Sequence, residues 1–122
     1  MLEKEGYEVM GAAFEVYNTL GSGFLEEVYQ QSLQIELTRR HIPFTPQQEL
    51  TLHYKGTQLG KTYIADLVAF NKVIIELKAA SFLTPDHAAQ LMNYLKASKC
   101  SIGYLINFGH AGTLEWRRIA LE

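Results

Sequence analysis

The sequence predicts a mixed α/β fold within a single domain spanning residues 1–122. Two observations support this prediction. Segments with apolar residues every three or four positions alternate along the chain with short runs of β-branched and apolar residues. The 122 residues are 48% hydrophobic and 20% charged, which suffices for one core and leaves no room for a second domain. The order helix, helix, strands, helix, strands favours a mixed central sheet flanked by helices.

The first third of the chain has the periodicity of two amphipathic helices. Apolar residues from Val9 to Leu20 recur at spacings of three and four, and Gly21 is a natural stop for a helix that begins near Glu3. A second helix is expected to begin near Gly23 and to end near Arg40. Its core-facing residues are expected to be Leu25, Val28, Tyr29, Leu33 and Leu37.

The rest of the chain outside the central segment predicts one further helix and several strands. Thr84-Pro85-Asp86 is a helix start, because Thr caps, Pro suits the first turn and Asp complements the helix dipole. That helix is expected to run to about Ser98. The remaining strands are expected over residues 49–54, 58–63, 102–107 and 114–119, the last of them at a sheet edge.

The central segment, residues 64–79, places three ionisable side chains in β-rich apolar surroundings. Two apolar runs flank Phe70-Asn71-Lys72, and Asn tolerates the left-handed backbone of a tight turn, so the segment predicts an antiparallel hairpin. With the turn centred on Asn71, Asp66 lies opposite Glu76 with β-carbons roughly 5 Å apart, and Lys78 follows on the same face. The opposite face is then entirely apolar and consists of Leu67, Ala69, Val73, Ile75 and Leu77.

Two opposed carboxylates repel each other unless one is protonated, a cation bridges them or a metal binds. From the residues alone, two interpretations remain open. Lys78 can neutralise Asp66 and Glu76 in a salt-bridged trio at a sheet edge. Alternatively, the two carboxylates hold a hard divalent ion such as Mg²⁺, and the Lys78 ammonium orients water or stabilises developing negative charge.

The spacing Asp66-x9-Glu76-x-Lys78 resembles the signature of the PD-(D/E)xK nuclease superfamily. The block Gly23-Phe-Leu-Glu26-Glu-Val-Tyr29 resembles the G-x-x-E-x-x-Y pattern of the GxxExxY protein family, a branch of that superfamily. Further blocks are similar to that family and occur in its order: Glu76-Leu-Lys78-Ala79, His87-x-x-Gln90-x-x-x-Tyr94-Leu95 and the segment from Gly103 to Gly109. The resemblance covers about residues 11–119 and implies the αβββαβ nuclease-like core.

The resemblance implies a hydrolase, an endo- or exonuclease that cleaves phosphodiester bonds with Mg²⁺ or Mn²⁺. Asp66 and Glu76 would hold the ion, Lys78 would activate water, and Gln90 would position water or Lys78. Glu26 would add a carboxylate to the metal shell, although taken alone it is also good helix-start chemistry. The alternative function is a non-catalytic nuclease-like module that binds nucleic acid or a protein.

Three further residues are implied as supports of this site. The hydroxyls of Tyr29 and Tyr94 are expected to fix it in place. His87 shares a helix side with Gln90 and Tyr94, but a lone His near a helix start is usually structural.

Charge and hydropathy bear on partners and location. The formal net charge is −2, yet the chain has seven acids and one lysine through Glu36, then six acids and ten Lys or Arg. We expect a nucleic-acid partner, DNA ahead of RNA, and a two-fold homodimer, because cutting both strands needs two sites. The charged opening Met1–Glu5 and the short apolar runs predict no membrane partner, no secretory signal and a cytoplasmic location.

Overall fold

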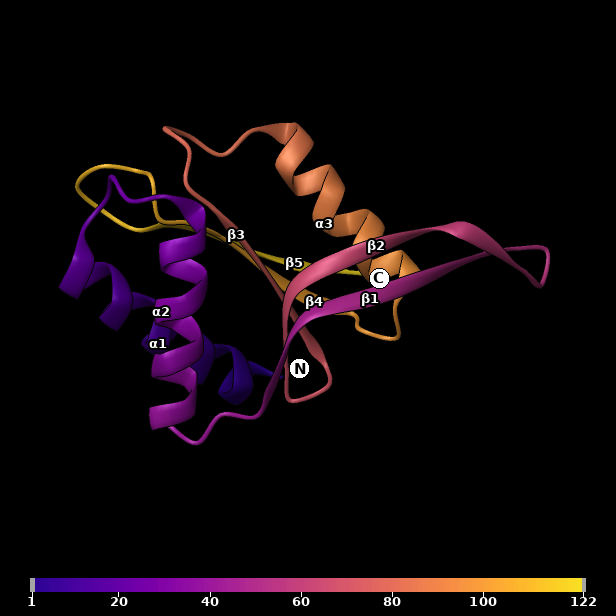
Figure 1. Cartoon of the computed structure of the whole chain (residues 1–122), viewed down its shortest axis with the longest axis horizontal. Helices are drawn as coiled ribbons and strands as arrows, with labels where there is room; N and C mark the ends of the chain where they lie inside the picture. The colour runs from indigo at the N-terminus through magenta and orange to yellow at the C-terminus, as the bar shows by residue number, and fades with distance from the viewer. Residues whose placement is uncertain (1, 122) are drawn as a thin grey trace.

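The computed structural model describes residues 2–121, which form a five-stranded mixed sheet and three helices (Figure 1). The strands lie in the order β1-β2-β3-β4-β5, with β3 and β4 parallel and every other neighbouring pair antiparallel. The predicted mixed sheet is therefore confirmed. In chain order the elements are α1 (Glu3–Leu20), α2 (Glu26–Arg39), β1 (Phe44–Tyr54), β2 (Thr57–Ala69), β3 (Val73–Lys78), α3 (Pro85–Ala97), β4 (Ile102–Asn107) and β5 (Glu115–Ala120).

The sheet lies between two helical layers (Figure 1). Helices α1 and α2 cover one face, where their apolar residues share a core with the predicted apolar face of the hairpin: Leu67, Ala69, Val73, Ile75 and Leu77. Helix α3 covers the other face, where Leu91 and Leu95 pack with Val68, Ile74 and Leu105. Since successive strand residues point to opposite faces, the central strands β3 and β4 are buried on both sides.

The β2–β3 hairpin has the predicted register. Leu67 pairs with Ile75 and Ala69 with Val73, so the turn is centred on Asn71. Both Phe70 and Asn71 adopt the left-handed backbone, with φ of 56° and 57°. A hydrogen bond from the Lys72 N–H to the Ala69 carbonyl closes the turn at 3.0 Å. The short loop and the apolar face therefore fix the same register.

Helix α2 begins at Glu26, later than predicted. Gly21 and Gly23 have left-handed φ values of 70° and 113°, which are incompatible with a helix, and Leu25 is an extended N-cap. The assignment of Leu25 and Val28 to the core is wrong, because their side chains are 79% and 36% exposed. The buried positions of α2 are Tyr29, Gln30, Leu33 and Leu37.

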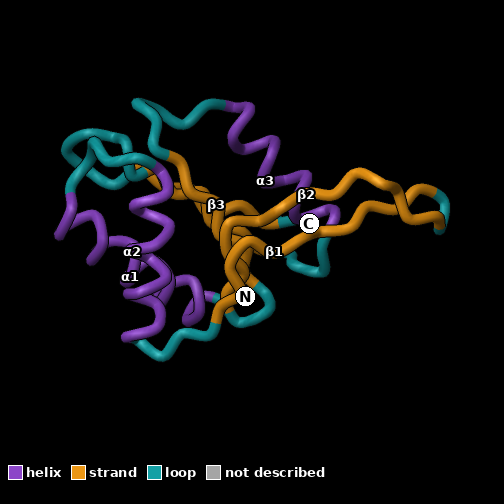
Figure 2. The backbone as a smooth tube through the Cα atoms, viewed as in Figure 1, coloured by secondary structure: helices purple, strands orange, loops and turns teal. Residues whose placement is uncertain are grey.

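Strands β1 and β2 extend beyond the sheet as a two-stranded arm (Figures 1 and 2). The sequence predicted separate strands at 49–54 and 58–63, but β1 starts at Phe44 and β2 runs continuously to Ala69. Residues 53–61 are all exposed. The missed residues of β1, 44–48, pair with residues 65–69 of β2 and are exposed or half-buried, so hydrophobic alternation did not reveal them.

Within residues 2–121, none of the helices combines the length and the hydropathy that crossing a membrane requires.

Candidate active site

Strands β2 and β3 separate at Asp66 and Glu76, and side chains take over the cross-strand hydrogen bonds. The Asp66 N–H donates to Glu76 Oε2 at 2.7 Å, and the Leu77 N–H donates to Asp66 Oδ2 at 2.8 Å. Each carboxylate is thus held by the backbone of the opposite strand. The predicted apposition of Asp66 and Glu76 is confirmed by these contacts.

Burial of the carboxylate pair shifts its protonation. Glu76 is only 3% exposed, and burial together with the charge of Asp66 raises its pKa to about 8, despite the hydrogen bond from the Asp66 N–H and the charge of Lys78. Burial also raises the pKa of Asp66, while the Leu77 N–H and Lys78 oppose the rise. Without a further cation, protonation of Glu76 is the main relief of the repulsion at neutral pH.

Lys78 contacts the helix rather than the carboxylates. Its Nζ donates a hydrogen bond to Gln90 Oε1 of α3 at 2.9 Å. Among the ion pairs of residues 2–121, none joins Lys78 to Asp66 or Glu76. The salt-bridged trio of Lys78, Asp66 and Glu76 is therefore not formed. The expected contact between Gln90 and Lys78 is formed.

Two polar residues to which the sequence analysis gave no role in the site hydrogen-bond the backbone at Asp66 and just after Lys78. Gln30, buried in α2, donates from Nε2 to the Asp66 carbonyl at 2.9 Å. Asn107, fully buried at the end of β4, accepts from the Ala80 N–H at 3.0 Å and fixes the segment after Lys78. One feature of the sequence could have indicated Gln30: it is a polar residue that directly follows the core residue Tyr29.

Tyr29 supports the loop that leads into α2. Its hydroxyl donates to the Gly21 carbonyl at 2.5 Å and accepts from the Phe24 N–H at 3.2 Å. Its ring stacks on Phe108, with centroids 4.7 Å apart. These contacts fix the backbone immediately before Glu26.

Tyr94 and His87 differ in their relation to the carboxylates. Burial raises the pKa of Tyr94, and the charges of Glu76 and Asp66 raise it further, which places this hydroxyl within their electrostatic reach. His87 instead caps α3: its Nδ1 accepts from the Thr84 N–H at 3.1 Å, and its N–H donates to Thr84 Oγ1 at 3.3 Å. A role for His87 beyond this cap stays a prediction.

Comparison with known proteins identifies the family of this chain. Residues 3–119 match the family model of the PD-(D/E)XK nuclease superfamily. The chain belongs to the PD-(D/E)XK nuclease superfamily. Proteins of this superfamily are usually nucleases that act on nucleic acids, generally with divalent metals. A search among curated proteins found no match.

One solved structure has a fold similar to that of this chain. The protein of the "Crystal structure of SSO0001" superposes with a TM-score of 0.64 at 17% sequence identity. The match covers 98% of this chain and 59% of the other, so the chain spans little more than half the length of that protein. At this identity the likeness shows the fold alone.

The carboxylate pair of this PD-(D/E)XK protein fits a hard divalent ion. One oxygen of each carboxylate accepts a backbone N–H, while Asp66 Oδ1 and Glu76 Oε1 accept no hydrogen bond within residues 2–121. Mg²⁺ is commonly held by one or two carboxylates, with waters and substrate phosphate completing its shell. The donor set and its spare oxygens therefore suit such an ion.

Glu26 lies near this pair but is not assembled with it into a three-carboxylate site. Burial and the charge of Asp66 raise the pKa of Glu26, which Lys78 opposes. Across residues 2–121, however, no three His, Cys, Asp or Glu side chains lie close enough to hold a metal together. The predicted role of Glu26 in the metal shell stays a prediction.

The raised pKa of Glu76 predicts a pH-dependent stability in EDTA. The folded carboxyl retains its proton up to about pH 8, whereas the unfolded carboxyl loses it near its ordinary value of 4.5. The contribution of Glu76 to the free energy of unfolding is therefore fully present below about pH 4.5 and falls as the pH rises through about 8. Urea unfolding across this range should show the fall, by up to several kcal/mol.

The Glu76→Gln variant should remove this part of the pH dependence, and the control Glu27→Gln, at an exposed carboxylate of α2, should retain it. Equal slopes in the parent and in Glu76→Gln would assign the effect to other groups.

Gly109 permits the close approach of two backbones beside the site. A β-carbon at Gly109 would lie 2.5 Å from backbone atoms of Ala79 and Ala80, directly after Lys78. Gly109→Ala should therefore displace this segment, destabilise the fold by about 1–3 kcal/mol and lower any cleavage rate. Thermal melts and cleavage assays test this, with Gly60→Ala as control because a β-carbon there meets no atom within 4 Å. Unchanged stability and activity in Gly109→Ala would contradict the expectation.

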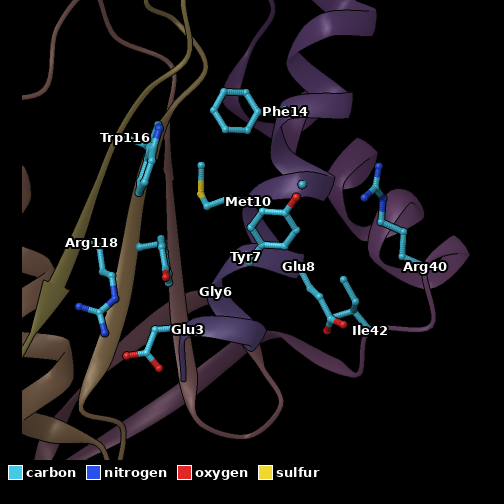
Figure 3. Close-up of a pocket in the computed structure, with 12 residues that line it drawn as sticks. Glu3, Gly6, Tyr7, Glu8, Met10, Phe14, Arg40, Ile42, Trp116 and Arg118 are labelled. Carbon is cyan, nitrogen blue, oxygen red and sulfur yellow. The ribbon is translucent and has the colours of Figure 1, made fainter. Parts of the chain in front are cut away.

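A pocket of about 790 Å³ lies apart from the carboxylates, between α1 and β5 (Figure 3). Trp116 and Arg118 of β5 flank one side of it, and Met10 and Phe14 of α1 line another (Figure 3). Neither Asp66, Glu76 nor Lys78 lines this pocket. Although this pocket is large, it is therefore separate from the predicted PD-(D/E)XK site.

Proposed function

We propose that this protein is a Mg²⁺- or Mn²⁺-dependent nuclease that hydrolyses phosphodiester bonds at Asp66, Glu76 and Lys78, with DNA ahead of RNA as substrate. The observation that carries the proposal is the carboxylate pair. Its two members are held by opposite strands, each with a spare oxygen, beside a lysine that Gln90 positions. Membership of the PD-(D/E)XK superfamily supports the reaction class.

Each residue of the proposed site has a role that follows from its contacts. Asp66 and Glu76 would hold the ion, which when bound polarises the phosphate and acidifies water. Lys78 supplies a fixed positive charge for the phosphate oxygens, whose negative charge is stabilised most in the transition state. Because Gln90 Oε1 accepts a hydrogen bond from Lys78 Nζ, it limits the positions open to the ammonium.

We also infer that the chain belongs to the GxxExxY branch of the superfamily. The motif has a physical basis here. Gly23 has a φ of 113°, which favours glycine, and the Tyr29 hydroxyl fastens the loop on both sides of that position. Glu26 follows as the first residue of α2, where its pKa is raised in part by the charge of Asp66, but it is not close enough to the carboxylate pair to hold a metal with both members.

A nuclease panel tests the proposed function. The parent protein is incubated with single- and double-stranded DNA and RNA in Mg²⁺, Mn²⁺ or EDTA, alongside Glu76→Ala. We expect cleavage that requires the metal and Glu76. Cleavage that persists in EDTA or in Glu76→Ala would contradict it, and binding without any cleavage would instead identify a non-catalytic module.

The predicted two-fold dimer is part of this proposal only for a duplex substrate, where two sites are needed to cut both strands. Light scattering at high protein concentration, with and without duplex DNA, should then give twice the monomer mass. A monomer in both conditions would contradict the dimer.

A further inference from the structure

Two adjoining pockets form a groove between α3 and the arm of β1 and β2. The first, about 550 Å³, lies between β2 and α3 and is lined in part by Gln90, the partner of Lys78. The second, about 360 Å³, continues between α3 and both strands of the arm. Tyr63 and Asn93 line both pockets, so the two pockets adjoin each other. Figure 2 shows the helix and the arm that bound this groove, which we call the α3–arm groove.

The α3–arm groove has the charge that attracts a phosphate backbone. Lys61 lines its first pocket and Lys96 its second, and both side chains are exposed. Among the residues lining the two pockets, Asp86 is the sole carboxylate. The face of the sheet covered by α1 and α2 is more acidic, since residues 3–40 contain seven acids against the three basic residues Lys4, Arg39 and Arg40. The distribution of charge therefore favours a polyanion on the α3 side.

The groove also offers a fixed aromatic ring. Tyr63 is half-buried, and its ring packs against Tyr94 with centroids 5.1 Å apart. Gln90 and Asn93 add exposed amides along α3. Lysines for phosphates combined with an aromatic ring for a base characterise sites that bind unpaired nucleotides.

We propose that the α3–arm groove binds a single strand of nucleic acid and leads it to Lys78, which makes single-stranded nucleic acid the substrate class. The catalytic consequence of this proposal rests on the proposed function, whereas the binding of a single strand in the groove does not. A duplex is disfavoured, because duplex-binding proteins commonly neutralise about six to ten phosphates and this groove carries two lysines. A single strand also needs only one active site, which removes the reason for a dimer.

Fluorescence anisotropy in EDTA tests the groove without cleavage. The probes are a labelled oligodeoxythymidylate of about 20 nucleotides, the matching oligouridylate and a blunt DNA duplex of equal length. Lys61→Ala/Lys96→Ala should weaken binding of the single strands about tenfold. It should also lower the slope of log affinity against log salt by about 1.4, since each phosphate contact on a single strand contributes about 0.7. Tyr63→Leu should weaken single-strand binding about tenfold with a small change in slope.

The matched control is Lys4→Ala/Lys72→Ala, which removes two exposed lysines outside the groove. It should stay within about twofold of the parent. Equal losses in the two double variants would overturn the proposal, as would absent single-strand binding or tighter binding of the duplex through Lys61 and Lys96. Thermal melts of each variant establish that the fold is intact.

The failures of the two proposals can be told apart. Metal-dependent cleavage with no selective effect of Lys61 and Lys96 on single strands would refute the groove and retain the nuclease. Groove-dependent binding with no cleavage by any metal would refute the nuclease and retain the groove.

Discussion

Lys78→Met is expected to fold and to bind metal but to lose about 100- to 1,000-fold in cleavage rate. The lysine is hydrogen-bonded to Gln90 and makes no ion pair with Asp66 or Glu76, so its removal leaves the backbone contacts of both carboxylates in place. Its interaction with phosphate strengthens in the transition state, and its loss therefore lowers the rate more than substrate binding.

Single-turnover cleavage at saturating Mn²⁺, thermal melts and nucleic-acid binding together measure this variant. Lys72→Met, an exposed lysine in the β2–β3 turn, is the matched control and should cut like the parent. A Lys78→Met protein that cuts as fast as the parent would remove the catalytic assignment. If Lys78 mainly neutralised the carboxylates, the variant would instead be unstable and Mn²⁺ would restore both stability and activity.

The double variant Asp66→Asn/Glu76→Gln is expected to lose the stabilisation that Mn²⁺ gives to the parent. An ion that binds only the native state at a hundredfold excess over its dissociation constant stabilises it by about 2.7 kcal/mol. For a domain of this size that corresponds to a rise in Tm on the order of 10 °C. The amide oxygens of Asn and Gln can still accept the backbone N–H groups of Leu77 and residue 66, so the fold should persist.

Thermal melts with EDTA and with saturating Mn²⁺ measure the difference. Glu15→Gln/Glu27→Gln, at exposed carboxylates of α1 and α2, is the control and should gain as much stability from Mn²⁺ as the parent. If the Asp66→Asn/Glu76→Gln protein gained as much too, the ion would bind elsewhere.

Features with a local cause were predictable from the sequence. The apolar alternation and the Asn71 turn fixed the hairpin register, because a slip of one residue would expose an entire apolar face. Thr84 and Pro85 marked the start of α3, since capping depends on neighbours three residues away. The apposition of Asp66 and Glu76 followed from the register.

Boundaries were less predictable where two local tendencies compete. Apolar residues around Leu25 favoured an early start of α2, but the left-handed backbone of Gly21 and Gly23 delays it to Glu26. The start of β1 at Phe44 was missed because residues 44–48, which pair with β2, are exposed or half-buried and carry no hydrophobic pattern.

From the sequence by itself, the two carboxylates, Lys78 and the helical Gln90 are predicted to carry the chemistry, and this assignment stays a prediction. Only the tertiary structure decided their partners. Gln30 of α2 donates to the Asp66 carbonyl, and Lys78 donates to Gln90 of α3 rather than to the carboxylates of its own hairpin. These contacts depend on where two helices pack against the sheet. The pKa of Glu76 likewise depends on burial by distant segments, which no local pattern of residues encodes.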